Sequence, residues 1–167
     1  MKTRCEVKMN FQCSMERAFK TPILGDATKI LTGFGVIPPV THFTDDETWG
    51  SVLGKRIPHA KPNFFSKGGA IGIDTVLVRT ENTYWKWEVK DFMQPSLGFT
   101  AFQGELLFSD LGNGSIEVKW RYTLFSNVLA LYPIQWLFTK VFWKGQMRRG
   151  IRNMKVLAET EAPYIYQ

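Results

Sequence analysis

The chain lacks most of the residues and motifs that indicate a particular activity. Only two of its 167 residues are cysteine and only two are histidine. It has no HExxH, no paired CxxC, no GxSxG and no phosphate-binding loop. Its beginning lacks the apolar stretch of a signal peptide, and the longest apolar region, 128–143, is interrupted by Gln135 and Lys140. We therefore expect a cytoplasmic protein with no metal site and no cofactor.

The two cysteines cannot pair with each other. Cys5 and Cys13 lie on one face of a single predicted strand, about 26 Å apart at about 3.3 Å per residue. A disulfide needs Cα atoms within about 7 Å of each other. Two unpaired thiols fit a reducing compartment.

Acidic residues are the scarcer charges, and the chain has a net charge of +6. The cations form no dense block interleaved with aromatic residues, so no nucleic acid is expected as a partner. Aromatic residues are plentiful instead, with 6 Trp and 13 Phe. They can fill a core, or they can line a cavity for an apolar guest.

Hydrophobic periodicity predicts the order of the elements. Alternating residues indicate a first strand at 4–13, and two short helices follow, at 15–20 with Ser14 as its N-cap and at 26–31. Further strands are predicted at 40–44, 51–59, from the Gly68-Gly69 turn to 79, and at 84–91, 99–109 and 116–124. From 131 onward the period becomes helical.

The closing helix has an apolar stripe that is expected to pack on the sheet. The stripe consists of Trp136, Trp143, Met147, Gly150, Met154 and Leu157. The layout as a whole predicts an α+β fold, a curved antiparallel sheet of about seven strands wrapped around a long C-terminal helix. We expect residues 1–167 to form one domain.

Several short motifs resemble one known superfamily. They are Phe11-Gln12-Cys13-Ser14 followed by Ala18-Phe19, Trp49-Gly50 with Gly54-Lys55-Arg56, Val118-Lys119-Trp120-Arg121-Tyr122, and Met147 with Met154. Together with the order of elements, they resemble the START-like helix-grip superfamily (SRPBCC), in particular its polyketide cyclase/dehydratase-like branch. The resemblance implies an apolar or amphipathic small molecule bound between the sheet and the helix.

Aromatic residues on inward strand faces and on the helix are the expected ligand-binding wall of this cavity. They are Trp85, Trp87, Phe102, Trp120, Tyr122 and Phe142. The hydroxyl of Tyr122 would orient a guest. No catalytic residue is assigned, because no acid or base stands out.

Four polar positions interrupt otherwise apolar strands. Asp74, Gln103 and Glu105 are expected on the solvated face of the sheet; one that faced the cavity instead would favour an enzyme. Arg56 pairs either with a strand neighbour or with a guest carboxylate. His42 and His59 are expected to be surface or loop residues and not metal ligands or catalytic bases.

The closing helix also has a basic stripe, formed by Lys140, Lys144, Arg148, Arg152 and Lys155. A solvated helix face is the expected role of this stripe. One alternative is weak association with anionic membranes, with Phe138 and Phe142 inserted. The other is a gate over the cavity, with Phe64-Phe65 at a predicted hairpin tip as its opposite lip. Three functions thus remain open: a small-molecule binder, a cyclase- or dehydratase-type enzyme on a polyketide-like substrate, and a lipid-handling protein at membrane surfaces.

Overall fold

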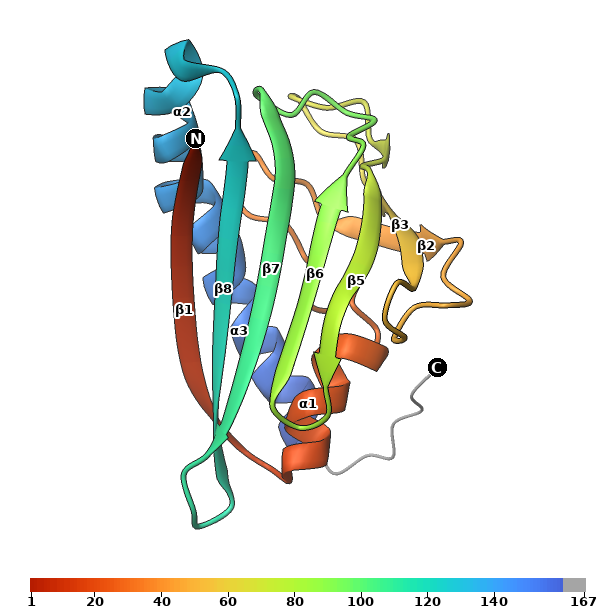
Figure 1. Ribbon diagram of the computed structural model, residues 1–167, viewed down its shortest axis with the longest axis vertical. Coiled ribbons are helices and arrows are strands. Elements are labelled where there is room, and N and C mark those ends of the chain that lie inside the picture. Colours follow the sequence, from red (N-terminus) through yellow and green to blue (C-terminus); the bar gives the residue numbers. More distant parts are fainter. Residues whose placement is uncertain (161–167) are drawn as a thin grey trace.

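The computed structural model describes residues 1–160, which form an eight-stranded antiparallel sheet and a long C-terminal helical segment behind it (Figure 1). The strands are β1 (Lys2–Gln12), β2 (Val40–Thr44), β3 (Lys55–Ala60), β4 (Gly69–Ala70), β5 (Ile73–Thr80), β6 (Tyr84–Lys90), β7 (Phe99–Asp110) and β8 (Ser115–Ser126). The helices are α1 (Met15–Leu24), η1 (Leu129–Leu131), α2 (Tyr132–Leu137), η2 (Phe138–Trp143) and α3 (Lys144–Glu159).

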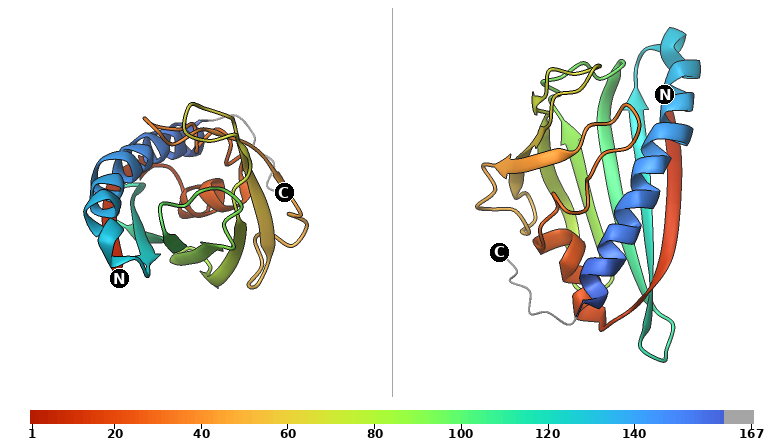
Figure 2. Two further views of the ribbon diagram at one scale, coloured as in Figure 1. Left: turned by 90° about the horizontal axis from the view of Figure 1, so that it is seen from above. Right: turned by 180° about the vertical axis from the view of Figure 1, so that it is seen from behind.

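The later strands of the sheet form a meander, and the first strand, β1, lies at one edge and pairs with the last, β8. The strand order of the sheet is β1-β8-β7-β6-β5-β3-β2, and β4 pairs with β3 off this path. The sheet curves around α1 and α3, so that sheet and helices enclose an interior (Figure 2). The predicted fold class is therefore confirmed, with the short β4 as an additional strand.

Strict alternation places the inward faces as the sequence predicts. In β1, Cys5, Val7 and Phe11 are buried and Met9 packs against the core, while the alternate residues face solvent. In β8, Val118, Trp120 and Tyr122 are buried in the same way. These strands pair along their whole length, so the core face is continuous across β1 and β8.

The predicted helix at 26–31 is wrong; this segment forms turns. The carboxylate of Asp26 accepts hydrogen bonds from the backbone N–H and the hydroxyl of Thr28, which fixes an Asx turn. The carbonyl of Leu31 then accepts from the backbone N–H of Val40 and not from a following helical turn. The first predicted helix is present and longer than expected. Ser14 caps it by accepting from the backbone N–H of Arg17 at 3.3 Å.

The long helical segment is not a uniform α-helix. Its middle part, η2, is a π-helix, and its wider turn shifts the inward face by one residue. Gln135 is therefore buried, while the predicted stripe residue Trp136 is 48% exposed. From Met147 to Met154 the predicted stripe is buried. Within residues 1–160, no helix is long and apolar enough to cross a membrane.

Candidate ligand-binding site

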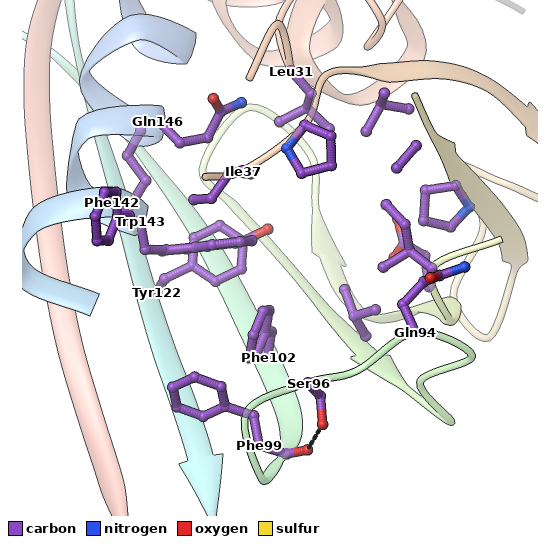
Figure 3. Close-up of a pocket in the computed structure, with 18 of the residues that line it drawn as sticks. Leu31, Ile37, Gln94, Ser96, Phe99, Phe102, Tyr122, Phe142, Trp143 and Gln146 are labelled. Atoms are coloured by element: carbon purple, nitrogen blue, oxygen red, sulfur yellow. Dashed lines mark hydrogen bonds between the residues drawn. The ribbon is translucent and has the colours of Figure 1, made fainter. Parts of the chain in front are cut away.

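A cavity of about 510 Å³ lies between the sheet, the long helix and the 31–39 loop (Figure 3). Aromatic and aliphatic side chains form most of its wall. The 31–39 loop is held against the helix by the guanidinium of Arg149, which donates to the carbonyl of Gly33 at 2.7 Å. Gly145 permits this approach, because a Cβ there would lie 2.2 Å from the ring of Phe34.

The structure brings all six expected wall residues to this cavity. Trp85 and Trp87 come from β6, Phe102 from β7, Trp120 and Tyr122 from β8, and Phe142 from η2. Their contact with a ligand stays a prediction.

Edge-to-face aromatic packing stiffens the wall beneath the helix. Trp143 contacts Phe102 and Tyr122 at centroid distances of 4.8 and 5.0 Å, and Trp87 contacts Tyr122 at 5.5 Å. Such pairs stabilise by about 0.5–1.5 kcal/mol each beyond their area burial. Sequence reasoning assigned Trp143 to packing alone, yet it also lines the cavity. Its inward direction agrees with the predicted apolar stripe, of which Trp143 is a member.

A buried ion pair lies in the wall. Arg56 on β3 and Asp74 on β5 are register partners, with Nε of Arg56 3.1 Å from Oδ2 of Asp74. The guanidinium of Arg56 also stacks over the rings of Trp49 and Phe43, at 3.6 and 4.1 Å from their centroids. Arg56 therefore pairs with its strand neighbour, one of the two roles expected for it.

The expectation that Asp74 faces solvent is wrong. Asp74 shares the inward face of β5 with Val76, and both are buried. Apolar residues occupy both faces of this strand, so its alternation did not identify the inward one. Burial raises the pKa of the Asp74 carboxyl, and the adjacent Arg56 guanidinium opposes this rise.

The other two polar strand residues lie on the outer face, as predicted. The Gln103 side-chain amide donates to the carboxylate of Glu88 at 2.9 Å. The Glu105 carboxylate accepts from the hydroxyl of Tyr84 at 2.6 Å. Neither lines the cavity.

Several polar atoms on the cavity wall have no hydrogen-bond partner within the described part of the chain. They are Oδ1 of Asp74, Oε1 of Gln146 and the indole N–H groups of Trp120 and Trp143. An unpaired buried polar group costs about 1–3 kcal/mol. All four atoms are buried within the wall itself. Gln146 was not anticipated from the sequence, because the predicted stripe was chosen by apolar residues; it lies one turn before Gly150 on the same side of α3.

The histidines take no part in the cavity. His42 and His59 stack on each other with ring centroids 4.3 Å apart, on the neighbouring strands β2 and β3, and His42 is exposed at the surface. Among residues 1–160, no group of three His, Cys, Asp or Glu residues is placed to hold a metal ion.

Comparison with known proteins identifies the fold. No protein-family model and no curated protein matches the sequence. Protein TTHA0849 from Thermus thermophilus superposes with a TM-score of 0.67 at 9% identity, over 93% of this chain and 97% of that one. A Thalictrum norcoclaurine synthase mutant superposes with a TM-score of 0.65 at 11% identity, over 95% of this chain and 94% of that one. Ara h 8.0201 gives 0.62 at 11% identity, over 92% and 98%. The chain thus has the START-like helix-grip fold that these structures share.

Proposed function

We propose that the protein binds an apolar or amphipathic small molecule in the cavity between the sheet and the C-terminal helix. The observation that carries this proposal is the cavity of about 510 Å³, whose wall consists mainly of apolar side chains. Ligand sites usually have volumes of about 300–1,000 Å³ and this type of lining. The norcoclaurine synthase structure of the same fold is a complex with a transition-state analogue, which agrees with the proposal.

The test begins with native mass spectrometry of the purified protein, which reveals a guest that copurifies. Uptake of the neutral fluorescent probe N-phenylnaphthylamine is then measured on protein freed of guest. We expect Ala60→Trp to abolish uptake, because Ala60 is buried in the cavity wall and an indole there fills the space. Lys86→Trp on the outer face of β6 is the matched control and should bind as the unmodified protein does.

Two results would contradict the proposal. One is the absence of both a copurified guest and probe uptake. The other is uptake that Ala60→Trp leaves unchanged, since the probe would then bind outside the cavity.

A second candidate, a cyclase- or dehydratase-type enzyme on a polyketide-like substrate, is favoured by one observation. Asp74 lines the cavity, and burial raises the pKa of its carboxyl, as a general acid requires. The Thalictrum structure of this fold is a norcoclaurine synthase, so the fold can host an enzyme. The test is the Asp74→Asn variant, with conversion of a short poly-β-ketone monitored by mass spectrometry. The enzyme is supported if the variant loses this conversion and still takes up the probe.

A further inference from the structure

Exposed apolar side chains gather at one end of the molecule. They belong to three segments, 61–68, 91–98 and 128–141, which lie together at the upper end in Figure 1. The most exposed are Phe64 at 95% and Leu129 at 74%. Isolated exposed apolar residues are ordinary on protein surfaces, but a contiguous group marks an interaction site.

The same end contains the mouth of the cavity. Phe65, Leu97, Ile134 and Leu137 are exposed to solvent, and all of them also line the cavity. We call the exposed apolar residues of the three segments the apolar rim. A guest that enters or leaves the cavity at this end passes between these side chains.

Polar side chains beneath the apolar rim tie its segments to one another. The Gln94 amide donates to the carbonyl of Gly68 at 2.6 Å, which joins the first two segments. The Gln135 amide donates to the carbonyl of Leu97 at 2.9 Å, which joins the second and third. These hydrogen bonds hold the three segments together, so the apolar rim is one continuous part of the fold.

The charge around the apolar rim is positive. Lys61 and Lys67 flank Phe64 and Phe65 in the first segment, and Lys140 is exposed in the third. Against these three lysines, the three segments contain a single acidic residue, Asp91. An apolar patch bordered by cations is complementary to an anionic lipid surface, which offers headgroup charge above an apolar interior.

We propose that the apolar rim docks on an anionic lipid bilayer, with the mouth of the cavity facing the membrane. In this orientation an apolar guest moves between bilayer and cavity without crossing water. The residues that insert are those of the rim. Phe138 and Phe142, the inserting residues expected from the sequence, instead line the cavity. Docking requires no guest, so this inference goes beyond small-molecule binding and is tested separately from it.

The test is flotation with phosphatidylcholine vesicles, with and without phosphatidylglycerol, at low and high salt. The rim variant is Phe64→Asp/Leu129→Asp; neither residue lines the cavity. The control is Leu111→Asp/Val156→Asp, which makes the same change in net charge at exposed apolar residues of the β7–β8 hairpin and the end of α3, 52% and 69% exposed. These positions lie at the opposite end of the molecule (Figure 1).

We expect the unmodified protein to bind the anionic vesicles, and to bind less at high salt. The rim variant should partition at least about tenfold more weakly, because each substitution removes inserted apolar area and adds an anion at the surface. The control should bind within about twofold of the unmodified protein. All three proteins should take up N-phenylnaphthylamine equally in the absence of vesicles, which separates docking from cavity binding.

Three results would overturn the inference. The first is that the unmodified protein fails to bind anionic vesicles. The second is that both double variants lose vesicle binding equally. The third is that no protein binds vesicles and the rim variant loses a self-association that the unmodified protein shows in size-exclusion chromatography. In the last case, the surface would be occupied by a second copy of the chain.

Discussion

Burial determines the chemistry of the inward cysteine. Burial raises the pKa of the Cys5 thiol from 9.0 to about 12, opposed by the charges of Lys140 and Lys144. The thiol donates to the sulfur of Met147 at 3.3 Å. Between pH 9 and pH 12 the unfolded chain loses this proton while the folded chain keeps it, so folding stability falls as the pH rises.

The expected slope is about 1.4 kcal/mol per pH unit from this one group. It is measured as the free energy of unfolding in denaturant across that pH window, in the unmodified protein and in Cys5→Ala. The variant should be less stable at neutral pH and should lack this part of the slope. Identical slopes in the two proteins would show that the thiol is not protected from ionisation.

Gly150 lies where α3 packs closely against Trp120 of β8. A Cβ at this position would be 2.7 Å from the ring of Trp120, which is buried. Helix propensity favours Gly150→Ala by up to about 1 kcal/mol, but overpacking costs about 1–3 kcal/mol. We expect the melting temperature of Gly150→Ala to fall. Arg152→Ala on the exposed side of α3 is the control and should change stability by less than about 0.5 kcal/mol.

At the scale of elements, the Arg56–Asp74 pair joins β3 to β5 inside the wall. Asp74→Ala leaves a buried cation without its partner and should cost about 3–5 kcal/mol. Arg56→Met/Asp74→Leu removes both charges and keeps most of the volume, and should be more stable than the single variant. The measurement is chemical unfolding of the three proteins. A double variant less stable than Asp74→Ala would mean that the pair contributes net stability beyond charge compensation.

The helical segment marks where prediction from sequence ends. A period of 3.6 predicts the inward residues from Met147 to Met154, because α3 is a regular α-helix. Across η2 the same period selects the exposed Trp136 in place of the buried Gln135. Thr139 is buried within η2, and its hydroxyl forms a hydrogen bond with the hydroxyl of Thr3 on β1 at 2.6 Å. Tertiary contacts of this kind stabilise the wider turn, and a helical wheel contains no term for them.

The inward residues of the strands were easier to predict than those of the helical segment, because alternation along a strand needs no tertiary contact to be read. Where one face is wet, alternation alone fixes the inward residues, as in β1 and β8. This is why the expected wall aromatics of β6 and β8 all reach the cavity. Asp74 was misplaced because apolar residues alternate on both faces of β5. To predict the ion pair, one would need the register between β3 and β5 that places Arg56 opposite Asp74, and the sequence alone does not give it.

At the scale of the whole molecule, the cavity lowers the stability of the empty protein. Its apolar wall lacks packing partners, and its unpaired polar atoms lack hydrogen bonds. The protein can recover this loss in two ways, by filling the cavity with a guest or by filling it with its own side chain. Both routes should raise the free energy of unfolding, and only the second should abolish binding.

A guest that binds only the folded chain stabilises it according to its concentration. At about 100 times the dissociation constant the gain is about 2.7 kcal/mol. For a chain of this size that gain corresponds to a rise in melting temperature of about 5–10 °C. We expect N-phenylnaphthylamine at such a concentration to produce this rise in the unmodified protein and in Lys86→Trp, and none in Ala60→Trp. Ala60 lines the cavity, so its replacement by Trp should block a probe that binds there. An equal rise in all three proteins would therefore show that the stabilising probe binds outside the cavity.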